Sequence, residues 1–342
     1  MEQNPYIYNN VGQPTRARDV RLDLLRVVGV IGGVFIHALE SADMSGTDFY
    51  WLMIFLPDTA AIFFMASGAI ILSRPRSTEW SYIRHRIFSF LPEFVLFSAL
   101  YAVLNQYFGL VPDDVSLLYQ ICYMFVTPTW APGWFILALI GIYLVLPLMA
   151  AWVRVATKRQ IEIGIAIWLV ATIIPVIAPH TNIDVPSTMF GTLFNYAGFA
   201  LMGYYLERWP LSQRTVAFKV GFFVVTAAIG IGFGYLIGQS GAKWGYMSSL
   251  VYCLSINIVM LSALMYGIVI MMPRSWFKGL TARIITGLSL MSLGIYCCHW
   301  LVVRYWVIEN HVDWFWGGMA ALAVAIPVAW VIRIIRKMLV RG

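Results

Sequence analysis

Ten long apolar segments, separated by short polar loops, account for most of this sequence. They lie at about residues 20–39, 50–73, 87–108, 133–153, 161–178, 188–206, 216–238, 247–272, 284–308 and 314–335. A helix needs about 20 mostly apolar residues to cross the hydrocarbon core of a bilayer. The sequence therefore predicts an all-α, polytopic membrane protein with about ten transmembrane helices.

The composition supports this interpretation. Of the 342 residues, 61% are hydrophobic and 11% are charged, whereas about a quarter of the residues in a soluble domain are charged. This excludes a soluble enzyme, a disordered chain and a secreted disulfide scaffold. One further apolar stretch, residues 117–126, is too short to span and is followed by Pro128 and Pro132. It predicts a short re-entrant or interfacial helix.

The basic residues indicate how the chain is oriented. With the N-terminus in the cytoplasm, 20 of the 23 Lys and Arg residues fall in inner segments, two fall in outer segments, and Arg26 falls inside the first span. Cytoplasmic loops of membrane proteins carry such an excess of Lys and Arg, so the net charge of +7 does not indicate a nucleic-acid partner. We expect a cytoplasmic tail at 1–19, a single transmembrane domain at 20–336 and a second cytoplasmic tail at 337–342.

Few ionisable side chains lie within the predicted spans, and each is a candidate functional residue because charge is costly inside a bilayer. They are Asp23, Arg26, His37, Asp58, Glu93 and His299. Arg26 and His37 are 11 residues apart, so they share one helix face and are separated by about 16 Å along its axis. Asp23 lies one turn before Arg26, and we expect the two to pair.

Structural interpretations of these candidates stay open beside the functional one. Histidine is the side chain best suited to act as a general base near neutral pH, but His37 also fits a hydrogen bond to a neighbouring helix. Asp58 follows Pro57 and fits either a partner of His37 or a helix cap. His299 lies in the ninth predicted span, at 284–308, and fits a satisfied core histidine as well as a site residue.

A dense basic loop follows the second predicted span. It contains Arg74, Arg76, Arg84, His85 and Arg86. These charges set the topology, and guanidinium groups also match phosphate geometry, so the loop is a candidate phosphate-binding patch. Glu93 is expected to form a structural ion pair with Arg86 or Arg84. The cysteines show no zinc or iron–sulfur spacing, so no metal is expected.

Several short motifs together resemble the membrane acyltransferase 3 family. The opening RLDLLRVVGVIGGVFIHALE carries an Arg-x10-His motif with an Asp three residues before the Arg. The segments AIFFMASGAIILSR, GWFILALIGIYLVLPL, FNYAGFALMGYYLE and SLGIYCCHW follow in the family's order. The chain departs from the pattern at Pro132 and Gly133, where many members have a His, and at Ser89, where an Arg is common.

The resemblance implies an integral-membrane O-acyltransferase of a bacterial cytoplasmic (inner) membrane. It would move an acetyl or similar short acyl group from acetyl-CoA, or another cytoplasmic acyl-CoA, to a hydroxyl of a cell-surface glycan or lipid-linked saccharide. On this basis the catalytic residues are His37, Arg26 and Asp23, supported by Asp58, His299 and Tyr296. The CoA phosphates would meet Arg74, Arg76, Arg84 and Arg86.

Two other functions stay open at this stage. Charged residues in the middle of broken spans also suit a transporter or flippase of a polysaccharide precursor, although the halves of the chain show no repeat. The third function is a membrane scaffold in a polysaccharide assembly complex. The residues do not determine the acceptor, the acyl group, whether His37 is a base or an acyl carrier, or whether the chain forms a homo-oligomer.

Overall fold

The structure is a computed structural model that describes residues 6–8, 14–16, 18–41, 52, 56, 59–74, 79–112, 114–181, 196–239 and 255–341. Two residues assigned to the candidate site from the sequence, Asp58 and Arg76, lie outside the described residues.

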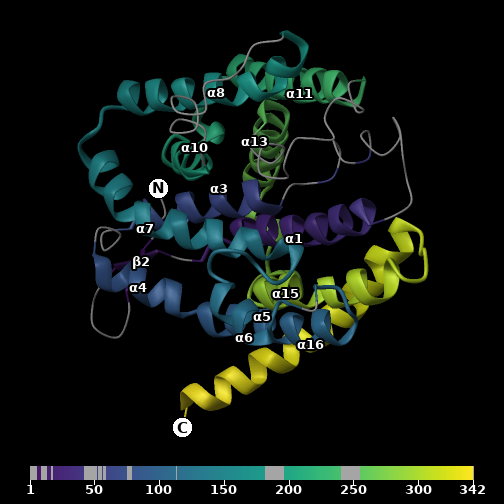
Figure 1. Ribbon diagram of the computed structural model, residues 1–342. Coiled ribbons are helices and arrows are strands. Elements are labelled where there is room, and N and C mark those ends of the chain that lie inside the picture. The colour runs from purple at the N-terminus through teal and green to yellow at the C-terminus, as the bar shows by residue number, and fades with distance from the viewer. Residues whose placement is uncertain are drawn as a thin grey trace.

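Helices occupy the described part of every predicted segment (Figure 1). They are α1 (Val20–Glu40), α3 (Thr59–Ile71), α4 (Trp80–Phe88), α5 (Leu91–Tyr107), α6 (Leu117–Tyr123), α7 (Trp134–Val155), α8 (Lys158–Thr181), α10 (Ala197–Arg208), α11 (Val216–Gln239), α13 (Ile256–Met271), α14 (Gly279–Ser289), α15 (Ser292–Val302) and α16 (Trp314–Arg341). Short 3-10 helices lie at η2 (Ala131–Gly133), η3 (Leu211–Gln213) and η5 (Arg274–Trp276), and a π-helix, η6 (Val303–Val307), continues α15.

The structure differs from the sequence-based expectation in two features, a short strand pair and a broken span. Near the N-terminus, β1 (Tyr6–Tyr8) pairs antiparallel with β2 (Pro14–Arg16), so that Tyr6 lies opposite Arg16. The predicted span at 284–308 also contains a break. It consists of two helices, because α14 and the α15–η6 helix meet at an angle of 61°.

The described helices make this a membrane protein with several spans. Five are long and apolar enough to cross a bilayer, namely 20–40, 80–107, 131–155, 216–235 and 314–338, and the bent pair would make a sixth. The count of ten and the orientation of the termini stay predictions. The seven-residue helix α6 lies in the stretch expected to be too short to span.

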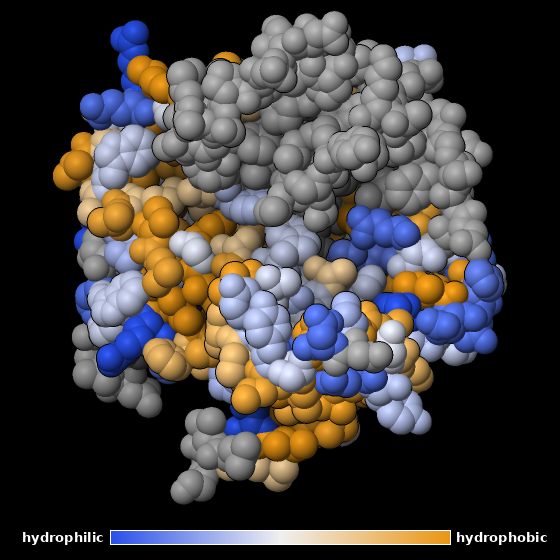
Figure 2. Space-filling model, viewed as in Figure 1, coloured by the Kyte–Doolittle hydropathy of each residue, from blue (hydrophilic) through white to orange (hydrophobic). Residues whose placement is uncertain are grey.

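A broad apolar surface fits a lipid environment. Large apolar side chains are exposed along α16, including Trp316, Trp330 and Met338. In Figure 2 hydrophobic residues gather on the lower part of the molecule, where Figure 1 places α16. A contiguous apolar surface of this kind would be a liability in water but is ordinary for helices that face lipid tails.

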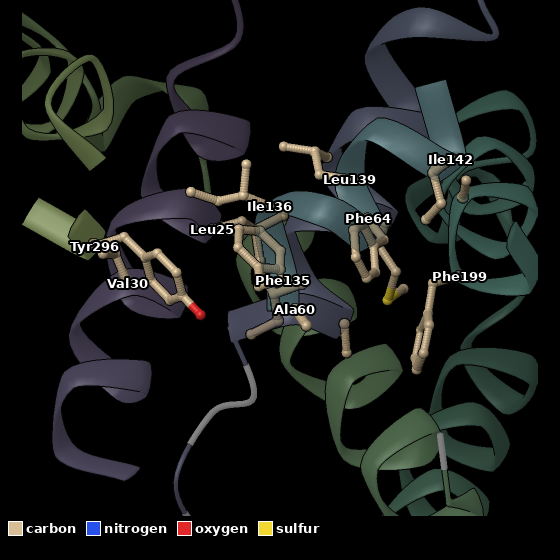
Figure 3. Close-up of a cluster of buried hydrophobic side chains, with 14 of the residues drawn as sticks. Leu25, Val30, Ala60, Phe64, Phe135, Ile136, Leu139, Ile142, Phe199 and Tyr296 are labelled. Carbon is tan, nitrogen blue, oxygen red and sulfur yellow. The ribbon is translucent and has the colours of Figure 1, made fainter. Parts of the chain in front are cut away.

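Helix α1 runs through the middle of the molecule, beside α3 (Figure 1). It also packs against α14, α15 and α16. The buried ring of Phe135, at the start of α7, lies between Tyr296 of α15 and Phe64 of α3, with centroid distances of 5.0 and 5.4 Å (Figure 3). This core fixes the position of α1 and α15 relative to each other, and the candidate site lies between these two helices.

Candidate active site

The last turn of α1 carries a histidine and a carboxylate in direct contact. His37 Nδ1 lies 2.9 Å from Glu40 Oε2, and the two side chains are 14% and 39% exposed. A carboxylate accepts, so Nδ1 carries the hydrogen and Nε2 of the neutral ring keeps a lone pair. The pair therefore presents an oriented imidazole with a basic nitrogen free to take a proton.

Glu40 was not among the candidate residues taken from the sequence. It lies directly after the first predicted span, at residues 20–39, and so is not counted among the ionisable side chains within the spans. Its spacing to His37 was the available signal, since side chains three residues apart on a helix are neighbours.

Rings from α15 surround His37. The imidazole of His299 stacks against it at a centroid distance of 5.3 Å, and Trp300 and Tyr296 lie at 5.8 and 6.4 Å. The Tyr296 hydroxyl donates to the carbonyl oxygen of Pro132, 2.8 Å away. The structure thus brings together His37, His299 and Tyr296, which were predicted to belong to one site. The backbone of η2 holds Tyr296 in place.

Arg26 lies on α1, about 16 Å from His37 along the helix axis, towards the N-terminal end of the helix. Its Nε is buried and has no hydrogen-bond partner among the described residues. The titratable groups within electrostatic range of its guanidinium are Tyr143, Asp23, Arg86 and Arg18. Arg26 therefore faces the part of the molecule that carries the basic residues, while His37 lies near the opposite end of α1.

The expected pairing of Asp23 with Arg26 is wrong. Arg18 donates to both carboxylate oxygens of Asp23, at 2.6 and 2.8 Å. Ser289 and Thr286 of α14 donate to the same carboxylate at 2.8 and 3.3 Å. These four bonds use the accepting capacity of Asp23, and no hydrogen bond or ion pair joins it to Arg26 in the described part of the chain. Asp23 therefore anchors α14 and the residues before α1.

The expected partner of Glu93 is also wrong, although it does form an ion pair. Arg336 of α16 reaches Glu93 at 3.1 Å and also donates to the carbonyl oxygen of Ser89. Arg86, one of the two partners expected from the sequence, instead donates to the Tyr82 hydroxyl at 3.0 Å. The partner comes from the far end of the chain, where short-range spacing carries no information.

The basic loop keeps its charges accessible where it is described. Arg74 and Arg84 are exposed and Arg86 is half-buried, and Arg154 donates to the carbonyl oxygen of Arg74 at 3.2 Å. In the described ranges no group of three or more His, Cys, Asp or Glu side chains is arranged to hold a metal ion.

A comparison with protein families identifies the chain. The family model described as an acyltransferase domain, acyltransferase 3, matches residues 19–334. The chain belongs to the acyltransferase 3 family. Searches of curated proteins and of solved structures found no match. As an acyltransferase 3 member the protein is a membrane acyltransferase, and the His37 site lies within the matched residues.

Proposed function

We propose that this acyltransferase moves an acetyl or similar short acyl group from an acyl-CoA to a hydroxyl of a glycan or lipid-linked saccharide. The observation that carries the proposal is the Glu40–His37 pair, which presents a lone pair on Nε2 at a partly exposed position. An imidazole oriented by a carboxylate is the arrangement that general-base catalysis of acyl transfer requires.

The chemistry needs one proton acceptor at this position. His37 Nε2 removes the proton of the attacking hydroxyl as its oxygen bonds to the thioester carbonyl carbon. The carbon–sulfur bond then breaks, and the imidazolium returns the proton to the departing thiolate, which leaves as CoA thiol. Glu40 holds the ring in the Nδ1–H tautomer and stabilises the imidazolium between these two steps.

Arg26 is proposed to orient the donor. Two roles are open to an arginine at this position, namely to orient the donor or to stabilise the oxyanion formed beside His37. A rise of about 16 Å along a continuous α1 separates the two residues, and an oxyanion donor must lie within about 3 Å of the developing charge. The pantetheine arm of CoA links the diphosphate to the thioester, and in an extended form it suits this separation, with the diphosphate near Arg26 and the thioester near His37.

The two ends of α1 are proposed to serve the two substrates. The exposed Arg74 and Arg84, with Arg86 and Arg76, would meet the phosphates of CoA on the cytoplasmic side of a bacterial inner membrane. His37 lies near the C-terminal end of α1, which is the outer end if the N-terminus is cytoplasmic. An acceptor could then reach it from outside the cell.

The decisive experiment compares two matched histidine substitutions in the purified protein. We expect His37→Asn to lower acetyl transfer and acetyl-CoA hydrolysis by about 10²- to 10⁴-fold, because the general base is lost. His311→Asn is the control, since His311 is exposed and has a positive φ of 49° that Asn tolerates. Wild-type turnover by His37→Asn would refute the role of His37.

Two further measurements separate this proposal from the alternatives. A transporter or flippase would move its substrate in vesicles with no acyl product. A scaffold would tolerate His37→Asn with no loss of acylated glycan, as measured by mass spectrometry of the cell surface.

A further inference from the structure

We propose that His299 positions the acceptor, by accepting a hydrogen bond from a second hydroxyl next to the one that is acylated. The acceptor is then a diol with neighbouring hydroxyl groups, as on a sugar ring, rather than a simple alcohol. This inference rests on the proposed function and adds to it a recognition element for the acceptor.

The tautomer of His299 follows from its hydrogen bond. Its Nδ1 lies 2.5 Å from the carbonyl oxygen of Tyr296. A carbonyl oxygen only accepts, so Nδ1 carries the hydrogen and Nε2 of the neutral ring holds a lone pair. Nε2 can therefore bind only a group that donates a hydrogen.

That lone pair is left without a partner in the protein. The His299 side chain is 0% exposed, and its Nε2 has no hydrogen-bond partner among the described residues. A buried acceptor without a donor is costly, and such groups are uncommon in native proteins unless a ligand or water completes them. The position calls for a donor that the protein itself does not supply.

The chemistry of the two substrates indicates which of them supplies the hydrogen-bond donor to Nε2 of His299. His299 stacks on His37 at a centroid distance of 5.3 Å, so a molecule that reacts at His37 lies next to His299. The reacting end of an acyl thioester consists of a carbonyl oxygen and a sulfur, and neither carries a hydrogen. The acceptor must supply both hydrogens, one to Nε2 of His37 from the reacting hydroxyl and one to Nε2 of His299 from its neighbour.

An amine also carries more than one hydrogen, but it fits this site less well. Near neutral pH it would arrive as an ammonium ion, and removing that charge from water beside Tyr296, Trp300 and Phe135 is costly. Hydroxyl groups of a sugar ring supply neutral donors at neighbouring positions.

The test uses small alcohols as acceptor probes, with acetyl-CoA and the full-length protein in detergent. Cyclohexanol is compared with cis- and trans-1,2-cyclohexanediol and cis-1,3-cyclohexanediol, and kcat/KM is expressed per hydroxyl. We expect at least one diol to exceed cyclohexanol by roughly tenfold or more, as one buried hydrogen bond predicts. His299→Phe removes the acceptor atom, so the ratio of kcat/KM for the preferred diol to that for cyclohexanol should fall to about one. His299→Gln restores an accepting oxygen and should recover part of the preference.

The outcomes are distinguishable from those of the proposed function. Equal turnover of diols and cyclohexanol by the wild-type protein overturns the role of His299, and this measurement does not depend on any variant folding. Retention of the diol preference by His299→Phe, or preferential transfer to 2-aminocyclohexanol nitrogen, overturns it as well. If acetyl-CoA is hydrolysed and no acetyl group is transferred to any of the diols, this result also contradicts the role of His299. Loss of hydrolysis in His37→Asn supports the proposed function whichever of these results is found, whereas no turnover of any acyl-CoA by the wild-type protein defeats both.

Discussion

At the scale of single residues, the candidate site depends on which atoms of each polar group remain unpaired. The two imidazoles each use Nδ1 as a donor, His37 to Glu40 and His299 to a backbone carbonyl. Both therefore keep a lone pair on Nε2. One faces a partly exposed position and suits a base, while the other is buried and suits recognition.

The carboxylate behind His37 is the first residue to test. We expect Glu40→Gln to lower kcat by roughly 10- to 100-fold, because an amide neither fixes the tautomer nor stabilises the imidazolium. Glu309→Gln is a matched control, because Glu309 is an exposed glutamate that pairs with Arg304 at 3.3 Å. An unchanged kcat in Glu40→Gln would remove Glu40 from the mechanism.

A second residue-scale prediction concerns acid stability. Asp19 caps α1 and pairs with Arg21 at 2.6 Å and Arg274 at 3.2 Å. Burial raises the pKa of Asp19, but the hydrogen bonds and charge of Arg21 and the charge of Arg274 lower it more, from 3.8 to about 2. The stabilisation is therefore present above pH 3.8 and is lost as the pH falls towards 2.

We expect Asp19→Asn to lower the free energy of unfolding by about 2 kcal/mol at pH 6, because Asn keeps the helix cap but loses the ion pairs. The difference from wild type should shrink between pH 4 and pH 2, as measured by thermal unfolding in detergent. Asp313→Asn serves as control, since Asp313 accepts from the Phe315 N–H at 3.0 Å and has no basic partner in the described residues. A difference for Asp19→Asn that is independent of pH would contradict this account.

At the scale of helices, two glycines decide how closely α3 and α10 approach. A Cβ atom at Gly68 would lie 1.9 Å from the carbonyl oxygen of Ala200, and one at Gly203 would lie 2.0 Å from that of Met65. Both obstacles are backbone atoms, so no side chain can move aside. Small residues allow this kind of close helix contact inside membranes. The contact holds α3 against the rest of the core that supports α1.

We expect Gly68→Ala and Gly203→Ala each to destabilise the fold by about 1–3 kcal/mol or more, because α3 and α10 must separate. The yield of monodisperse protein and its melting temperature in detergent measure this. Gly141→Ala on α7 is the control, because a Cβ there meets nothing within 4 Å and alanine favours helix. Equal stability of all three variants would show that α3 and α10 do not cross as described.

At the scale of the whole molecule, the number of spans decides on which side each loop lies. Before Thr157, which connects α7 to α8, the ten-span prediction counts four spans. Three of the helices that are long enough to cross a membrane precede the same residue. The difference arises from the predicted span at 50–73, of which the structure describes the 13-residue α3 and few other positions.

A reporter fused after Thr157 therefore tests the topology. We expect it to be cytoplasmic, as is one fused at the C-terminus, because the basic residues alternate correctly only with ten spans. Green fluorescent protein and alkaline phosphatase fusions report opposite sides of the membrane and check each other. Phosphatase activity after Thr157 would instead favour the smaller number of spans.

Local features of the site were predictable from the sequence, whereas its contacts were not. The shared face of Arg26 and His37 follows from helix periodicity alone. The partners of Asp23 and Glu93 did not follow, because Arg18 and Arg336 compete successfully for them. The stacking of His299 on His37 joins α15 to α1 across more than 250 residues of chain, and no spacing rule reaches that far.

The sequence alone determined that this chain is a helical membrane protein of the acyltransferase 3 family, because apolar length and short motifs are local properties. It also marked His37 and Arg26, since ionisable groups in apolar segments are few. Only the tertiary structure decided that His299 stacks on His37, that Nε2 of His299 is buried without a donor among the described residues, and that Ser289 and Thr286 bind Asp23. These depend on which side chains meet across helices, and burial makes every such pairing specific.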